Sequence, residues 1–96
     1  MSSFLSREEA QNLLEQGGLV VDVRSAEEYT AGHASETLNL PLHILPVLAK
    51  ERIPKDRPLL LCCASGARSA MAVAFLLPQG YEAYNLGSWV SHPHLS

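Results

Sequence analysis

Apolar and polar residues along this chain form short segments of two kinds, which alternate from one end to the other. Continuous apolar runs of a few residues are typical of strands buried in parallel sheets, and apolar residues recurring every three or four positions predict helices. The predicted strands lie at 19–23, 37–40, 58–62 and around 82–85, and the predicted helices lie between Ser6 and Gly17 and at 26–31, 42–52 and 68–77. Strands that alternate with helices predict an α/β fold, a small central parallel sheet with helices on both faces.

The helix boundaries are supported by local signals. Ser6 with Glu9, and Ser25 with Glu28, have the spacing of capping boxes, which predicts a helix start at each site. Glycines follow both of these helices, as expected for helix ends. Pro46 lies inside the predicted helix 42–52, so it must occupy the first turn or break the helix.

Length and charge narrow the class of protein. Ninety-six residues suit one domain, expected to span 1–96. The net charge of −3, without a basic run, argues against nucleic acid as a partner. No apolar stretch reaches the roughly 18 residues that cross a bilayer, so no membrane partner is expected. The N-terminus lacks the pattern of a signal peptide, and a cytoplasmic location is expected.

The two cysteines, Cys62 and Cys63, are adjacent. Neighbouring residues of a strand point to opposite faces, and a vicinal disulfide is strained, so a disulfide framework is excluded. The histidines are scattered without a recognisable ligand spacing. No metal site is therefore expected.

Cys63 is the residue whose position most directly indicates a chemical function. It lies between an apolar strand and an apolar helix, at the start of the run Cys63-Ala64-Ser65-Gly66-Ala67-Arg68-Ser69. The carboxyl end of a parallel strand is where α/β proteins bind ligands. A helix N-terminus stabilises an anion, so the nucleophilic thiolate form of Cys63 should be favoured there. Gly66 would allow the tight turn that such a loop requires.

Three motifs, in this order and spacing, resemble those of single-domain rhodaneses, a family of sulfurtransferases. The first motif comprises Asp22-Val23-Arg24, Glu28-Tyr29, Gly32-His33 and Asn39-Leu40-Pro41, the second is the run from Cys63 to Ser69, and the third is Gly87-Ser88-Trp89. The resemblance covers nearly the whole chain. It implies a rhodanese-like fold and an enzyme of the thiosulfate sulfurtransferase type.

The resemblance implies that Cys63 accepts a sulfane sulfur from thiosulfate or a persulfide donor and becomes a persulfide. The sulfur would then pass to cyanide, a thiol or a thioredoxin-like protein. No cofactor is expected, because the sulfur is carried covalently. The N–H groups from Ala64 to Ser69 would converge on the sulfur as an anion-binding nest. If Arg68 folds back toward the loop, its guanidinium could hold the oxygens of thiosulfate.

Some positions depart from the family pattern or support the site. Ala64 and Ala67 stand where many members have basic or polar residues, which leaves Arg68 as the only cation of the loop. The pull on anionic donors should therefore be weak. Asp22 and Arg24 are interpreted as a structural ion pair or hydrogen-bond anchor. The segment 34–37 lacks the glycine usual before the Asn-apolar-Pro stretch, which leaves its turn open.

Other functions stay open. Counting from Cys62 gives the spacing of cysteine-dependent phosphatases, although no histidine precedes Cys62 and the glycine falls one place too late. The domain could also be a non-catalytic partner-binding scaffold, or a sulfur carrier loaded by another protein. The apolar helix after Arg68 is the single hint of association, and the oligomeric state is left open.

Overall fold

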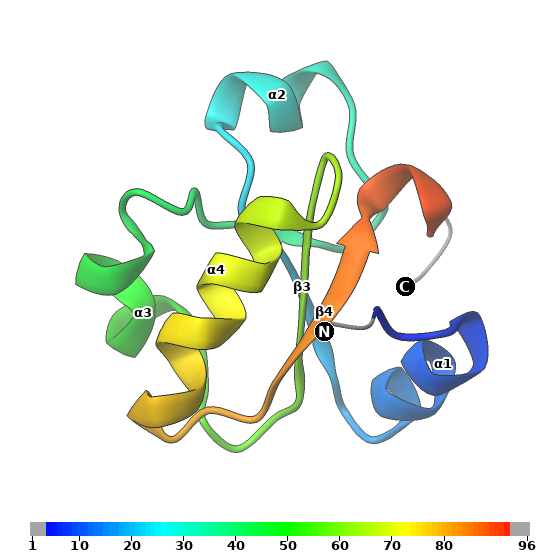
Figure 1. Ribbon diagram of the computed structural model, residues 1–96, viewed down its shortest axis with the longest axis vertical. Coiled ribbons are helices and arrows are strands. Elements are labelled where there is room, and N and C mark those ends of the chain that lie inside the picture. The colour runs from blue at the N-terminus through cyan, green and yellow to red at the C-terminus, as the bar shows by residue number, and fades with distance from the viewer. Residues whose placement is uncertain (1–3, 93–96) are drawn as a thin grey trace.

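Parallel strands organise the computed structural model, which describes residues 4–92 (Figure 1). The strands are β1 (Leu19–Asp22), β2 (Leu38–Asn39), β3 (Leu59–Cys63) and β4 (Ala83–Ser88), in the spatial order β2-β1-β3-β4. The helices are α1 (Arg7–Glu15), α2 (Ala26–Ala31), α3 (Leu45–Arg52) and α4 (Ala67–Leu76), followed by the 3₁₀ turns η1 (Leu77–Gln79) and η2 (Trp89–Ser91). The expected α/β fold with a parallel sheet is confirmed.

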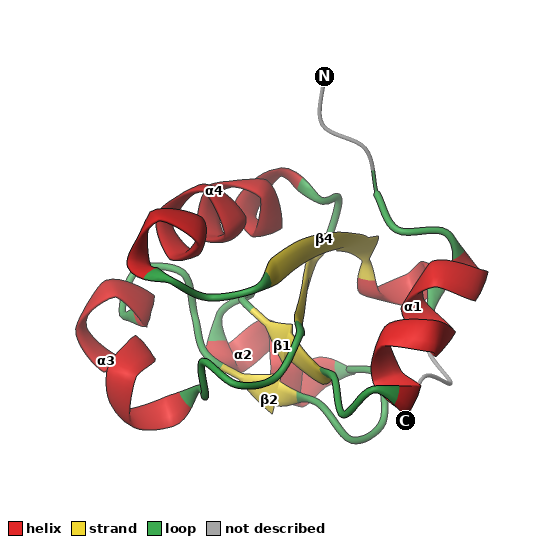
Figure 2. Ribbon diagram, turned by 90° about the horizontal axis from the view of Figure 1, so that it is seen from below, coloured by secondary structure: helices red, strands yellow, loops and turns green. Residues whose placement is uncertain are grey.

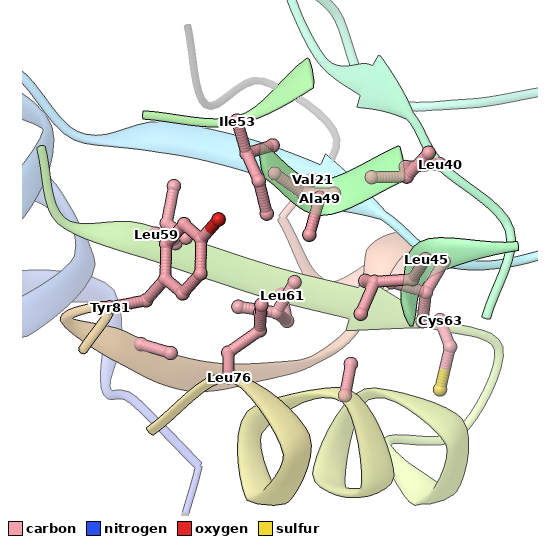
Figure 3. Packing of buried hydrophobic residues seen from close by; sticks show 13 residues of the cluster. Val21, Leu40, Leu45, Ala49, Ile53, Leu59, Leu61, Cys63, Leu76 and Tyr81 are labelled. Carbon is pink, nitrogen blue, oxygen red and sulfur yellow. The ribbon is translucent and has the colours of Figure 1, made fainter. Parts of the chain in front are cut away.

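Helices cover both faces of the sheet. In Figure 2, α3 and α4 lie on one side of the strands and α1 lies on the other. The strand β3 is buried along its whole length, so its alternate side chains feed two cores. Leu59, Leu61 and Cys63 pack with α3 and α4 (Figure 3). Leu60 and Cys62 pack with α1 on the other face. The two cysteines therefore point to opposite faces, as expected.

The apolar helix α4 is buried on one side only. Ala72 and Leu76 pack into the core, while Met71 is 62% exposed. Its alanines allow close approach to the sheet beneath it. The prediction of a helix stopped at Pro78 and Gly80 is confirmed, with η1 as its last turn.

Several predicted boundaries were wrong. β1 ends at Asp22 and β2 spans only Leu38–Asn39, so both strands are shorter than predicted. The helix α3 begins at Leu45 rather than Leu42, because the preceding residues form a turn, and Pro46 occupies its first turn. The strand β3 continues to Cys63, one residue further than predicted. The strand β4 continues to Ser88, three residues beyond the predicted end at 85, so Gly87 and Ser88 belong to the strand.

The extension of β4 depends on an irregularity in its pairing with β3. Leu61 pairs with Asn85 and Cys62 pairs with Gly87, which leaves Leu86 as an extra residue on β4. A bulge of this kind re-aims the side chains beside it. Gly87 has a φ of 92°, a conformation that glycine adopts without strain. The sequence pattern contains no signal for this register shift.

The turn left open at 34–37 is made without glycine. Glu36 has a φ of 55°, in the left-handed region that L-residues rarely adopt. The turn leads into β2, whose Asn39 donates its side-chain amide to the carbonyls of Asp22 and Arg24, both at 3.0 Å. Within residues 4–92, no helix has the length and apolar character needed to cross a bilayer.

Candidate active site

The sulfur of Cys63 lies in a loop of backbone donors at the carboxyl end of β3. The N–H of Gly66 donates to Cys63 Sγ at 2.9 Å, and the N–H of Ser69 lies at 3.4 Å. The Ser69 hydroxyl is 3.5 Å from the same sulfur. Figure 3 shows Cys63 at one end of the core, with its sulfur toward the first turn of α4. The expected nest of N–H groups around the sulfur is present through Gly66 and Ser69.

The loop favours the anionic form of Cys63. Burial is the largest single influence and acts to raise the thiol pKa, because it penalises charge. Hydrogen bonds from Ser69, Ser65 and Gly66 act in the opposite direction, and together they hold the pKa of Cys63 below its ordinary value. A lowered pKa in a ring of donors is the state that a thiolate nucleophile requires.

Gly66 is required in this loop for two reasons. Its φ of 99° lies in the left-handed region, and it precedes the first residue of α4. A Cβ at this position would lie 2.5 Å from the ring of Phe4. The same ring would lie 3.0 Å from a Cβ at Gly87. The Phe4 ring thus packs on Gly66, within the loop from Cys63 to Ser69 (the sulfur loop), and on Gly87 of β4.

Arg68 does not fold back over the loop. Its guanidinium makes a two-pronged ion pair with Glu28 of α2, with Nη1–Oε1 at 2.7 Å and Nη2–Oε2 at 3.0 Å. The Arg68 bond and then the Ser25 backbone N–H lower the pKa of Glu28 to about 2. The one cation expected to attract an anionic donor is therefore already paired with a carboxylate.

The remaining loop side chains are small and face outward. Ala64, Ser65 and Ala67 are exposed, whereas Ser69 is fully buried. A hollow of about 260 Å³ adjoins Arg68, and its lining residues are Val23, Ser25, Pro41, Leu42, His43 and Arg68. Cys63 itself has no exposed surface. A reactant must therefore displace part of the loop to reach the sulfur.

Asp22 and Arg24 form the ion pair that the sequence suggested, with Nη2–Oδ2 at 2.8 Å and both side chains buried. Arg24 also donates to the carbonyls of Glu28 at 3.3 Å and Gly32 at 2.7 Å. Its guanidinium lies 4.5 Å from the centre of the Trp89 ring. The pair therefore holds α2 in place, and with it the carboxylate that binds Arg68.

Ser69 belongs to a second network, on the side of the loop facing β4. Its hydroxyl is 2.7 Å from Asn85 Oδ1, which also accepts the N–H of Gly87 at 2.9 Å. Asn85 Nδ2 donates to the carbonyl of Gly66 at 3.0 Å. Ser69 does not cap α4, because the N-cap is Gly66 and no side chain makes a cap hydrogen bond there.

Sequence reasoning missed three residues of this site. Glu28 was interpreted as part of a capping box and of a family motif, without a role at the loop. It does accept the N–H of Ser25 at 2.9 Å, and it also binds Arg68. Asn85 gave one signal, a polar residue inside a strand, two residues before a glycine. Phe4 gave no local signal, since its partners lie far along the chain.

The metal-ligating residue types do not gather within residues 4–92: no group of three or more His, Cys, Asp or Glu side chains is placed to hold an ion. His33 makes a local contact instead. Its Nδ1 is 2.7 Å from the carbonyl of Tyr29, and the two rings stack with centroids 3.7 Å apart. The structure thus gives His33 a local structural role.

Comparison with known proteins agrees with the fold. The model of the rhodanese-like domain matches residues 6–91. This chain belongs to the rhodanese-like domain family. A rhodanese homologue from the extremely thermophilic bacterium Thermus thermophilus superposes with a TM-score of 0.73 and is 35% identical, with 95% of this chain and 99% of that chain covered.

Named relatives of this rhodanese-like domain are sulfurtransferases. A sulfurtransferase of Allochromatium vinosum is 46% identical over 63 residues, which cover 66% of this chain and 58% of that protein. The thiosulfate sulfurtransferase GlpE of Pseudomonas savastanoi pv. phaseolicola is 39% identical over 76 residues, covering 78% of this chain and 70% of that protein. The matches thus span between about half and three quarters of these relatives' length.

Proposed function

We propose that this rhodanese-like domain is a sulfurtransferase in which Cys63 carries the sulfur. The observation that carries the proposal is the N–H of Gly66, 2.9 Å from Cys63 Sγ in a loop that lowers the pKa of the thiol. A buried thiolate with backbone donors around it is a nucleophile whose charge is stabilised without a metal or cofactor. The names of the relatives support the same reaction class.

The reaction balances in two displacements. The Cys63 thiolate attacks the outer sulfur of thiosulfate, a new S–S bond forms, and sulfite leaves with the electron pair of the old S–S bond. The resulting persulfide then yields its terminal sulfur to a nucleophile. Attack by cyanide gives thiocyanate, attack by a thiolate gives a new persulfide, and in both cases Cys63 leaves as the thiolate. Neither step consumes an external oxidant or reductant.

The choice of donor follows from Arg68. Because Glu28 offsets its charge, the loop gives a doubly charged donor such as thiosulfate little net attraction. The outward-facing residues Ala64 and Ala67 leave room for a larger donor or acceptor. We therefore expect a persulfide, either a small molecule or one on a protein, to load Cys63 faster than thiosulfate does at equal concentration.

A phosphatase based on Cys62 is not supported. The Cys62 side chain is on the opposite face of β3, where burial raises its pKa, and Asp22 adds to the increase. The alternative of a carrier domain differs from the proposal only in which protein loads Cys63. Both are forms of sulfur transfer through the same thiol.

The test is incubation of the full chain with thiosulfate or glutathione persulfide, followed by intact mass measurement. We expect a gain of one sulfur that cyanide removes, in wild type and in Cys62→Ala, and none in Cys63→Ser. Alanine is the better control at position 62, because serine would bury a hydroxyl in an apolar cluster. A cyanide-labile sulfur on Cys62, or no adduct from either donor, would contradict the proposal.

A further inference from the structure

Asn85 is a buried polar side chain that the sulfur-transfer scheme leaves unused. It is 8% exposed, lies in β4 at the register shift, and directs its amide toward the start of α4. Its hydrogen bonds connect the Gly66 carbonyl, the Gly87 N–H and the Ser69 hydroxyl. Two of these partners, Gly66 and Ser69, are also the donors to the Cys63 sulfur.

The partners of Asn85 determine which way its amide faces. The Gly87 N–H can only donate, so the atom 2.9 Å from it must be the oxygen Oδ1. The Gly66 carbonyl can only accept, so the atom 3.0 Å from it must be the nitrogen Nδ2. The orientation of the amide is therefore settled by two backbone groups.

This orientation determines the position of the Ser69 proton. The Ser69 hydroxyl lies 2.7 Å from Asn85 Oδ1, an acceptor, so Ser69 must donate to it. A hydroxyl has one proton, and Ser69 can then only accept at its 3.5 Å contact with Cys63 Sγ. A thiol suits this contact, since S–H is a weak donor. A thiolate does not, because a lone pair of oxygen would face the charged sulfur.

We propose that Asn85 is a positioning residue that competes with the Cys63 sulfur for the Ser69 proton. The Ser69 hydroxyl donates its hydrogen bond to Asn85 Oδ1 while Cys63 is a thiol, and it rotates to donate to the sulfur when Cys63 becomes a thiolate. Asn85 Oδ1 keeps the Gly87 N–H after the rotation, so no buried acceptor is left unpaired. The rotation exchanges a neutral hydrogen bond for a stronger one to a charged sulfur.

Substituting Ser69 or Asn85 removes no charge near the sulfur, because both side chains are neutral. The ionisable groups that make contacts beside the loop include the pair Arg68 and Glu28, the pair Asp22 and Arg24, Cys62 on β3, and His43 in the adjoining hollow. All of these stay in place in every variant below except Cys62. A change in the titration of Cys63 then reports on hydrogen bonds.

The experiment is the pH dependence of alkylation of Cys63 by iodoacetamide, in a Cys62→Ala background where Cys63 is the only thiol. We expect Ser69→Ala to raise the pH midpoint of Cys63 alkylation and to lower the alkylation rate at pH 7 about five-fold. The size of the effect is the difference in strength between a hydrogen bond to a charged sulfur and a neutral one. Ser69→Ala leaves Asn85 Oδ1 bonded to Gly87, so it should fold. An unchanged midpoint would overturn the proposal.

A double-mutant cycle isolates the competition. Asn85→Ala also removes the anchor of the Gly66 carbonyl, and the Ser69→Ala background measures that effect alone. The change that Asn85→Ala causes in the alkylation midpoint of Cys63 is measured twice, once with Ser69 present and once in the Ser69→Ala background. With Ser69 present, we expect this change to lie about 0.5 pH unit toward lower pH, because the freed hydroxyl can donate to the thiolate. Equal shifts in the two backgrounds would overturn the proposal. If Asn85→Ala does not give a cooperative thermal transition, the Ser69→Ala result decides by itself.

Tyr84→Phe is the matched control. Tyr84 neighbours Asn85 on β4, and its hydroxyl donates to the exposed carboxylate of Glu82 at 2.6 Å, its one hydrogen bond within residues 4–92. No midpoint shift is expected, and a shift equal to that of Asn85→Ala would overturn the proposal. The consequence for turnover rests on the proposed function, but alkylation reads the thiol itself. A chain with the expected coupling that gains no sulfur from either donor would refute the function and leave this inference intact.

Discussion

Cys62 and Cys63 are neighbours on one strand, and both are fully buried, yet their surroundings shift the pKa values of the two thiols in opposite directions. Burial raises the pKa of Cys62, and within residues 4–92 no hydrogen bond to its sulfur is found. Burial acts on Cys63 in the same direction, but the hydrogen bonds of Ser69, Ser65 and Gly66 reverse the outcome. Removal from water therefore makes a thiol inert unless donors replace the water.

The difference between the two sites arises from β3 and what lies on its two faces. Cys62 faces α1 among aliphatic residues such as Ala10, Val20 and Leu86. Cys63 is the last residue of the strand, so its side chain reaches the N-terminus of α4, where backbone N–H groups lack partners within the helix. A shift of one residue along the strand exchanges an apolar contact for an anion site.

The difference in reactivity between Cys62 and Cys63 should be reduced most by substituting Gly66. Gly66→Ala places a side chain at a φ of 99° and beside the Phe4 ring, so the loop must change and the N–H that donates to Cys63 must turn away. We expect Cys63 alkylation at pH 7 to fall on the order of ten-fold, since a hydrogen bond to a charged group is lost. The free energy of unfolding should fall by about 1–2 kcal/mol.

Gly17→Ala is the matched control for Gly66→Ala. Gly17 has a φ of 92°, and a Cβ there would meet nothing within 4 Å. It should lose about 1–2 kcal/mol of stability, measured by urea unfolding, without any change in the alkylation rate of Cys63. Equal loss of thiol reactivity in both variants would show that the reactivity follows global stability and does not depend on the Gly66 N–H.

The second prediction concerns the charge beside Cys63. Glu28→Gln keeps an oxygen for the Ser25 N–H but removes the charge that binds Arg68. The folded state holds the pKa of Glu28 at about 2, below its ordinary value of about 4.5, so the ion pair stabilises the fold above about pH 4.5 and loses that effect as the pH falls toward 2. The wild type should therefore have the higher urea midpoint at pH 7, with the difference closing at low pH.

Both partners of this ion pair are more than one-third exposed, so the difference in midpoint should be small and should shrink in high salt. The same substitution releases the charge of Arg68, and loading by thiosulfate should become faster while Cys62 stays unreactive. A midpoint difference that is independent of pH between 2 and 7 would contradict the assignment of the stabilising charge to Glu28.

The smallest expected effect lies away from both cysteines. Glu36 adopts a φ of 55°, which glycine adopts without steric penalty, so Glu36→Gly should raise the free energy of unfolding by about 0.5–1 kcal/mol. Glu36→Ala, which keeps the Cβ, should give no such gain. Alkylation of Cys63 should be unchanged in both variants. A stability gain in the alanine variant would show that the carboxylate, and not the backbone, is unfavourable at this turn.

Most of the fold, and the identity of the sulfur loop, could be predicted from the sequence because their signals are local. An apolar run predicts β3, capping pairs predict the starts of α1 and α2, and Gly66 marks the turn after Cys63. The direction of Arg68 could not be predicted, because its partner Glu28 is supplied by another helix. The pattern of apolar and polar residues does not indicate which of several carboxylates a distant arginine will bind.

The same reasoning explains why Asn85 was missed and Asp22 with Arg24 was not. The ion pair joins residues two apart, so the sequence itself brings them together. Asn85 lies two residues after Ala83, which packs on the α4 side of the sheet, so strand alternation turns Asn85 toward α4. Its partners Gly66 and Ser69 are distant in the sequence, and the order of apolar and polar residues does not specify which loop a strand residue meets.

The packing of Phe4 on Gly66 and Gly87 has a consequence for how this molecule folds. The ring joins residues that are 62 and 83 positions apart in the sequence. Contacts of large sequence separation slow folding, because the entropy of closing the loop is lost before the contact forms. The packing beside the Cys63 loop is thus expected to depend on the docking of a distant segment as well as on the loop itself.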